Sequence, residues 1–190
     1  MPEPDFDPLF DRALSVVLAH EGGFADNRND PGGATNFGIS LRWLKEIGMS
    51  DIDADGSPDG DINLDGHIDI DDIRLLTRET AGAFYRRFWW DKFGYGELHL
   101  SVGTKVFDLA VNMGAQQAHK VLQRACRACG PRLLDDGILG PKSREAISAI
   151  PPADLVIAMR SEAAGFYRAL VMARPGLSSF LTGWLNRAYA

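Results

Sequence analysis

The sequence lacks the features of several protein classes. Its 190 residues include only two cysteines, Cys126 and Cys129, which are too few for a disulfide-stapled scaffold and which we expect to be reduced. No apolar run approaches the ~20 residues that a membrane-spanning helix needs. The first residues, Met1–Asp5, are acidic and have neither the basic nor the apolar part of a secretory leader. We therefore expect a protein that is made in the cytoplasm and leaves it only through a pore formed by another protein.

Lysine and arginine are absent from residues 51–72, which contain nine aspartates. This stretch accounts for the formal net charge of −6, because without these nine the 26 acidic residues fall to 17, against 20 basic ones. The remaining body is mildly basic, but it has no clustered stripe of lysine and arginine. We expect no nucleic-acid partner, whereas a polyanionic polymer such as a cell wall is compatible with this charge.

Apolar residues recur at helical spacing along most of the chain. Phe10, Leu14 and Val17 are an example, and Gly22-Gly23 ends their segment. Helices are expected over residues 8–20, 39–48, 71–93, 104–113, 115–129, 141–150, 152–173 and 180–188. No stretch has sustained strand alternation, so the predicted fold class is mostly α, with at most a small β element near residues 24–40.

The composition, 45% hydrophobic over 190 residues, is sufficient for one domain with two lobes. The pattern shifts near residues 96–103. We predict a first lobe over residues 1–98, into which residues 51–72 are inserted, and a helical second lobe over residues 99–190.

Glu21 stands where the first predicted helix meets Gly22-Gly23, and a polar loop follows it. A carboxyl group at such a place can be held by the helix end on one side and face a cleft on the other. A carboxyl group that is partly shielded from water retains its proton more readily, as a general acid requires. The alternative is an ordinary exposed residue at a helix end.

Several segments resemble glycoside hydrolase family 108, the lysozyme-like muramidases of phages and bacteria, some of which are described as secretion activators. The similar segments are His20–Phe24, Asn29–Ile39, Leu76-Thr77, Tyr85–Trp89, Val106–Gly114 and Leu122-Gln123. The later segments Asp136–Pro141 and Gly183–Arg187 resemble the peptidoglycan-binding region of that family. The resemblance covers nearly the whole chain except residues 51–72, in the order that the family has.

The resemblance implies a lysozyme-like fold and hydrolysis of the β-1,4 bond between N-acetylmuramic acid and N-acetylglucosamine. Glu21 matches the catalytic glutamate of the family and would protonate the leaving sugar oxygen as oxocarbenium character builds on the ring. The implied partner is peptidoglycan, and the implied setting is a phage or prophage endolysin, expected as a monomer and released through a holin-type pore. The alternatives are a lytic transglycosylase, a non-catalytic wall-binding secretion activator and a calcium-dependent docking module.

The second catalytic group is less well defined by the sequence. Phage-type lysozymes share a glutamate, then eight residues, an aspartate or cysteine, then five residues and a threonine. Asp30 stands at the first of these spacings from Glu21, and we predict that it is the base or a charge stabiliser. Thr35 follows Asp30 after only four residues, one short of this pattern, and Asn36 takes the five-residue spacing. Thr35 nevertheless has the hydroxyl group of the pattern, and we predict that it positions a water molecule. The alternative for Asp30 is a turn residue before Pro31.

Two further residues are predicted to contact substrate. Asn112 matches the Asn-x-Gly of the family and could form a hydrogen bond with an acetamido group, although it could instead cap its helix before Gly114. Tyr95, with Tyr85, Trp89 and Trp90, could stack on sugar rings, although about half of these aromatic residues are expected in the core.

Residues 61–72 match the calcium-binding loop of EF-hand proteins position by position, with Gly66 at the sharp turn. The predicted ligands of a Ca²⁺ ion are Asp61, Asn63, Asp65, His67 through its carbonyl group, Asp69 and Asp72. An aspartate at the last position, where glutamate is usual, resembles a dockerin-type loop. The alternative is a solvated acidic linker.

A second loop in the same style begins at Asp51, but its last position would be Ile62, so a second ion near residues 51–59 is weakly indicated. The ion at 61–72 is expected to clip the chain together, and it could also act as a switch that keeps the protein loose where calcium is scarce.

Overall fold

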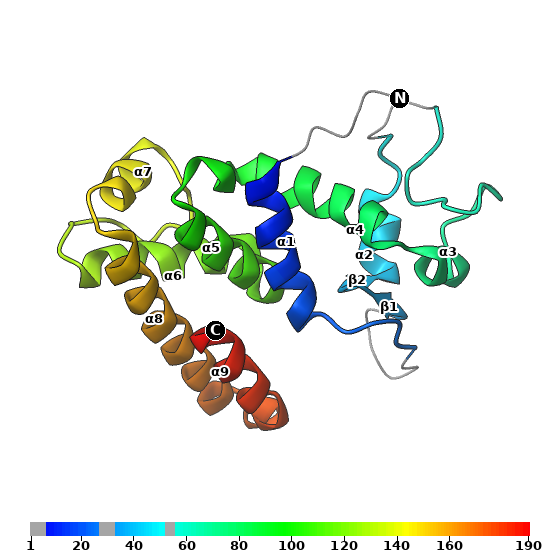
Figure 1. Ribbon diagram of the computed structural model, residues 1–190. Coiled ribbons are helices and arrows are strands. Elements are labelled where there is room, and N and C mark those ends of the chain that lie inside the picture. Colours follow the sequence, from blue (N-terminus) through cyan, green and yellow to red (C-terminus); the bar gives the residue numbers. More distant parts are fainter. Residues whose placement is uncertain (1–6, 27–32, 52–55) are drawn as a thin grey trace. The chain divides into compact units, whose positions relative to one another are not determined.

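The computed structural model describes residues 7–26, 33–51 and 56–190, and it divides into two compact units (Figure 1). Residues 17–88 form the hairpin unit, and the chain up to Val16 together with residues 89–190 forms the helical unit. We expected the division between residues 98 and 99. The boundary in the structure lies earlier, between residues 88 and 89, because Trp90 and Tyr95 pack with Phe107 in the helical unit.

The fold class is confirmed: helices dominate, and the sheet found among the described residues is two-stranded and antiparallel and lies within the predicted 24–40 region. The elements are α1 (Pro8–His20), β1 (Thr35–Asn36), β2 (Ile39–Ser40), α2 (Leu41–Ile47), α3 (Ile70–Leu75), α4 (Arg78–Tyr85), the π-helical η1 (Arg86–Asp91), the 3₁₀ turn η2 (Tyr95–Glu97), α5 (Leu100–Met113), α6 (Ala115–Ala128), α7 (Pro141–Ser148), α8 (Pro152–Ala173), the 3₁₀ segment η3 (Pro175–Phe180) and α9 (Leu181–Tyr189). In the described parts of the chain, no helix is both long and apolar enough to span a bilayer.

In the hairpin unit, β1 and β2 pair so that Asn36 faces Ile39 and Thr35 faces Ser40. The turn between them places Phe37 at φ 50° and Gly38 at φ 77°, both in the left-handed region that suits the twist of a tight hairpin. The side chain of Asn36 is buried, and its Nδ2 donates to the carbonyl oxygen of Ile73 at 3.0 Å. This bond joins the hairpin to α3.

The single helix expected over residues 71–93 is three elements. The first part, α3, ends at Leu75. The hydroxyl group of Thr77 accepts a hydrogen bond from the backbone N–H of Thr80, and the hydroxyl group of Thr80 accepts one from the N–H of Thr77. This reciprocal capping box starts α4. After Tyr85 the helix widens into η1, where the bulky residues Phe88, Trp89 and Trp90 follow one another.

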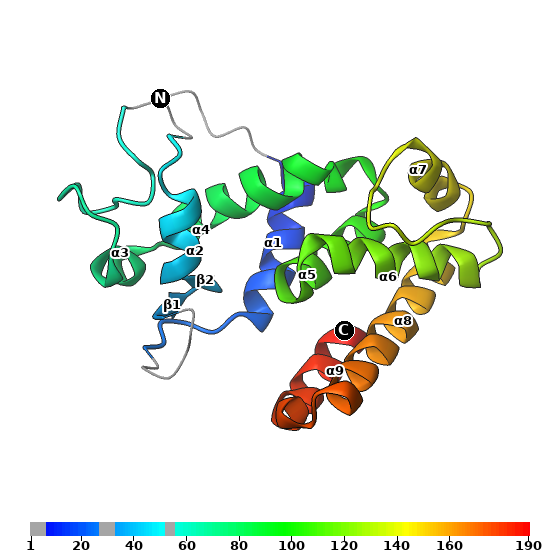
Figure 2. The same cartoon turned by 180° about the vertical axis from the view of Figure 1, so that it is seen from behind.

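In the helical unit, α6 packs against α5 and α8, and α9 packs against α8. Figures 1 and 2 both show α8 and α9 side by side near the C-terminus. The side chains of this unit that are fully buried include Val106, Phe107, Leu122, Leu155 and Met159. Their burial follows the helical spacing of the sequence.

Three charged residues lie inside the helical unit and connect α5 to α9. The Lys105 ammonium group donates to the carbonyl oxygen of Arg187 at 2.7 Å, and the Arg187 Nε donates to Asp108 Oδ1 at 2.9 Å. Lys105 and Asp108 also form an ion pair at 3.9 Å, and all three residues are buried. Burial lowers the pKa of Lys105 from 10.5 to about 8, even though the charge of Asp108 opposes this shift.

This buried lysine makes the stability of the helical unit depend on pH. The folded state binds fewer protons than the unfolded chain between pH 8 and 10.5, so the free energy of unfolding rises with pH in that range. We expect wild type to gain about 1 kcal/mol between about pH 7.5 and 9 relative to Lys105→Met, as measured by urea unfolding. Lys92→Met removes an exposed lysine of the same unit and should follow wild type. Parallel curves for wild type and Lys105→Met would contradict the assignment.

Candidate functional site

Glu21 is the first residue after α1. Its backbone N–H donates to the carbonyl oxygen of Val17 at 3.2 Å, so the residue is still held in the last helical turn. Its side chain is half-buried. Gly22 and Gly23 follow, and a Cβ on either would meet no atom of the described residues within 4 Å. The helix end therefore fixes the backbone of Glu21.

The turn of the β1–β2 hairpin lies directly against the Glu21 side chain. A Cβ on Gly38 would stand 2.6 Å from Glu21 Oε2 and 2.6 Å from the hydroxyl oxygen of Tyr85. Both groups therefore approach the same side of the Gly38 backbone, and only glycine gives them room. The positive φ of Gly38 is a second reason for glycine at this position.

Tyr85 holds the turn in place. It is almost completely buried at the end of α4, and its hydroxyl group donates to the carbonyl oxygen of Phe37 at 2.9 Å. The sequence pattern grouped Tyr85 with other aromatic residues as a possible sugar contact. The structure instead puts its polar end beside the Glu21 carboxyl group, a pairing that the spacing of the two residues in the chain did not indicate.

The other predicted catalytic residues are placed as follows. The backbone N–H and carbonyl groups of Thr35 both bond to Ala25, at 2.8 Å each, so Thr35 joins the chain after Gly23 to the hairpin. Asn36, which has the five-residue spacing, points to the opposite face of the strand and is used in the bond to α3. Asp30 lies outside the described residues.

The two predicted substrate contacts lie in the helical unit. Asn112, in the last turn of α5, is exposed, and its Oδ1 accepts a hydrogen bond from the Tyr167 hydroxyl group at 2.6 Å. Tyr95 is 0% exposed, and its hydroxyl oxygen lies 2.8 Å from His119 Nε2. Since its ring has no exposed face, Tyr95 lies in the core, which is one of the two positions that the sequence left open for it.

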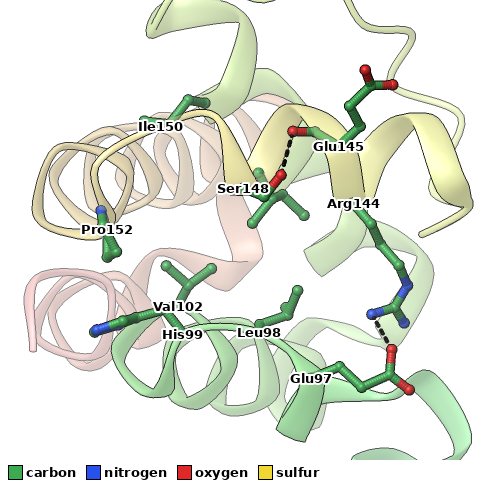
Figure 3. A pocket seen from close by; sticks show the side chains of 10 residues that line it. Glu97, Leu98, His99, Val102, Arg144, Glu145, Ser148, Ile150 and Pro152 are labelled. Atoms are coloured by element: carbon green, nitrogen blue, oxygen red, sulfur yellow. Dashed lines mark hydrogen bonds and ion pairs between the residues drawn. The ribbon is translucent and has the colours of Figure 1, made fainter.

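One hollow of the helical unit is shown in Figure 3 and has a volume of about 540 Å³. Leu98 and Val102 line it on one side and Ile150 and Pro152 on the other. Its cation, Arg144, is already engaged, at 2.9 Å from the Glu97 carboxylate and 2.8 Å from the carbonyl oxygen of Phe93. The hollow contains none of the residues that the sequence predicted for catalysis.

Residues 61–72, which we call the aspartate loop, are folded around two buried carboxylates, those of Asp61 and Asp72. Asp61 accepts hydrogen bonds from the backbone N–H groups of Asp65 at 3.1 Å and Gly66 at 2.8 Å. Asp72 accepts them from Ile62 at 2.8 Å, Asn63 at 3.3 Å and Asp69 at 2.7 Å. Gly66 has φ 88°, as a sharp turn requires, and Asp69 caps α3.

The donor set of this loop fits a hard cation. The oxygen-bearing side chains of Asp61, Asn63 and Asp65 lie on one tight turn, and within the described residues neither Asp61 nor Asp72 pairs with a lysine or an arginine. Over that same part of the chain, however, no three acidic, histidine or cysteine side chains converge closely enough to hold a metal as they stand. The start of the second predicted loop lies partly outside the described residues.

Comparison with known proteins finds two matched regions in the chain and a similar solved structure. The family model described as glycosyl hydrolase 108 matches residues 14–114, and a model described as a predicted peptidoglycan domain matches residues 117–189. A structure titled "Structure of Brucella abortus SagA" is similar over 94% of this chain and 92% of that chain, with 25% identity and a TM-score of 0.66. No curated protein matches. Since the first match spans Glu21, the hairpin and Tyr85 together and covers more than half of the sequence, the chain belongs to the glycosyl hydrolase 108 family.

Proposed function

We propose that this protein hydrolyses the β-1,4 bond between N-acetylmuramic acid and N-acetylglucosamine in peptidoglycan, with Glu21 as the general acid. The observation that supports it best is the approach of the Glu21 carboxyl group and the Tyr85 hydroxyl group to one side of Gly38. The family of the chain and its second matched region, described as a predicted peptidoglycan domain, point to the same substrate.

In this proposal the Glu21 carboxyl group gives its proton to the glycosidic oxygen while the bond from that oxygen to the anomeric carbon breaks. A water molecule then adds to the anomeric carbon and gives one proton to the Asp30 carboxylate, the proposed base, so that both products carry hydroxyl groups. Asp30 and Thr35 are the proposed groups that hold this water. Tyr85 is a positioning residue, because its bond to Phe37 fixes the turn against which Glu21 rests.

A lytic transglycosylase is the alternative that uses the same acid. There, the 6-hydroxyl group of the muramic acid attacks the anomeric carbon instead of water, and the product is a 1,6-anhydro sugar. The non-catalytic secretion activator is the other alternative, and it needs no acid at Glu21. Mass spectrometry of the released fragments separates all three: reducing muramic ends, anhydro ends or no fragments.

The first test is Glu21→Gln, which keeps the shape of the side chain and removes the proton donor. We expect turbidity loss of purified peptidoglycan to slow by about 100- to 10,000-fold, the range of positioned acid catalysis. The circular dichroism spectrum and the melting temperature should stay those of wild type. Glu46→Gln, an exposed change on α2, is the matched control and should retain full activity. A folded Glu21→Gln protein with wild-type activity would contradict the proposal.

Gly38→Ala tests the geometry rather than the acid. A Cβ here would collide with the Glu21 carboxyl group and the Tyr85 hydroxyl group, and φ 77° strains any side chain. We expect activity to fall by about tenfold or more, because the acid is displaced, with a stability loss of about 1–2 kcal/mol.

Gly23→Ala is the control for this change, since the same methyl group there meets nothing within 4 Å. Its turbidity assay and urea midpoint should match those of wild type. Equal activity of the Gly38→Ala and Gly23→Ala proteins would show that the Glu21–Gly38–Tyr85 packing does not matter for catalysis.

We also propose that residues 61–72 bind one Ca²⁺ ion that stabilises the hairpin unit. Two carboxylates, Asp61 and Asp72, are buried in this loop, and their partners within the described part of the chain are backbone N–H groups. A cation would offset the cost of burying them. Asn63 and Asp65 would add side-chain oxygens, and His67 a carbonyl group. The proposed effect is on folding, because α3 begins within this loop and Asn36 of the hairpin bonds to Ile73.

Titration of the metal-free protein with CaCl₂ tests this. We expect the melting temperature to rise and calorimetry to give a dissociation constant in the range of about 10⁻⁷ to 10⁻³ M that calcium loops cover. Asp65→Asn should weaken binding at least about tenfold, through loss of a charged ligand. Asp71→Asn is the control, because that side chain is exposed and pairs with Arg74. Binding that is unchanged in Asp65→Asn, or no binding by wild type, would contradict the proposal.

Four further points stay predictions from the sequence: release through a holin-type pore, a phage or prophage origin, a monomeric state and a second ion near residues 51–59.

A further inference from the structure

A second, larger groove in the helical unit has a volume of about 910 Å³ and is formed by the loop before α7 and by α7 itself. We call it the α7 groove and define it by Arg132, Leu134, Ile138, Lys142 and Glu145. It lies wholly within residues 117–189, the part that matches the predicted peptidoglycan domain.

The apolar side chains of this groove are exposed although the loop that carries them is firmly held. Leu134 is 78% exposed and Ile138 67%. Between them, Asp135 pairs with Arg124 at 2.6 Å, and the N–H of Gly137 donates to the Gln123 side chain at 2.8 Å. The exposure of Leu134 and Ile138 is therefore a property of an anchored loop, and apolar groups presented in a hollow are typical of a binding surface.

The charges of the groove are available to a ligand. Arg132 and Lys142 are exposed, and within the described residues neither forms a hydrogen bond or an ion pair. Asp136 also lines the groove, but its Oδ1 is occupied by Gln123 at 2.7 Å and by the N–H of Ile138 at 2.8 Å. Glu145 is exposed, and Figure 3 shows its carboxylate pointing away from the smaller hollow.

The smaller hollow of Figure 3 differs from the α7 groove because its cationic side chain already has partners. Its arginine, Arg144, is neutralised by Glu97 and held by the carbonyl oxygen of Phe93. A ligand carboxylate would have to break these bonds before it could bind there, whereas Arg132 and Lys142 of the α7 groove need give up only water.

We infer that the α7 groove binds the stem peptide of peptidoglycan, and this inference rests on the proposed function. The stem peptide has small alkyl side chains, several free carboxylates and, at its diamino acid, one amino group. Leu134 and Ile138 would contact the alkyl groups, Arg132 and Lys142 the carboxylates, and Glu145 the amino group. The glycan strand fits less well, because sugars are commonly held by aromatic rings and no aromatic residue is among those described as lining this groove.

Calorimetric titration of the full-length protein with a soluble tetrapeptide, L-alanyl-γ-D-glutamyl-diaminopimelyl-D-alanine, tests this without any cleavage. We expect saturable binding that weakens at least about tenfold in the double variant Arg132→Gln/Lys142→Gln and with added salt. The same tetrapeptide with its carboxylates converted to carboxamides should bind at least about tenfold more weakly to wild type. Arg42→Gln/Lys45→Gln changes two exposed cations of α2 and is the matched control.

Three results would overturn the inference: no binding of the tetrapeptide, equal binding of the carboxamide form, or a double variant that binds as wild type does. Preferential binding of peptide-free glycan chains that is lost in the double variant would also overturn it. Failure of the proposed function is distinguishable, because Glu21→Gln should bind the tetrapeptide normally. A wild type that binds the tetrapeptide and releases no fragments from walls would contradict hydrolysis and leave the groove assignment standing.

Discussion

The contact on which the hairpin unit most depends is the packing of two side chains over the backbone of Gly38. Glu21 comes from the end of α1 and Tyr85 from the end of α4, and the hairpin turn lies between them. The hydrogen bond from Tyr85 to Phe37 holds the turn, and the bond from Asn36 to Ile73 ties the same hairpin to α3. Three helices are thus linked to a sheet of only four residues. A carboxyl group held by such a frame has few conformations to lose when substrate binds, which favours a general acid.

Much of this unit could be predicted from the sequence because its signals are local. The helix α1 ends at His20, just before Gly22-Gly23, as expected. The helix α3 begins at Ile70, so residues 61–72 form a loop that continues directly into a helix. The role of Tyr85 could not be predicted in the same way. Its hydroxyl group meets the Phe37 carbonyl group across 48 positions of the chain, and no periodicity carries that information.

Tyr95 shows a related limit. An aromatic residue beside Trp90 and Phe93 in the sequence is compatible with a core or with a sugar surface, and only tertiary packing decides between them. Here Phe93, Tyr95, Phe107 and His119 form one cluster, which closes over the Tyr95 ring. The pairing of Asp108 with Arg187 could not be predicted either, because the two residues are 79 positions apart. In the sequence, each is compatible with a surface charge on an amphipathic helix.

The two units use their charges in opposite ways. In the helical unit, the Asp108 carboxylate pairs with both buried cations, Lys105 and Arg187, so each of these charges has a partner within the core. In the hairpin unit, Asp61 and Asp72 are buried, and among the described residues their carboxylates bond to backbone N–H groups and to no cationic side chain. Dipoles of N–H groups offset part of the cost of this burial, and a bound cation would offset the rest. The same comparison holds at the surface, where Arg144 pairs with Glu97, while Arg132 and Lys142 are exposed and form no ion pair with any residue that the structure describes. Charges without a partner inside the chain are the ones that an external ion or an anionic polymer can bind at the lowest cost, and this difference is what separates the proposed binding surfaces from the structural ion pairs.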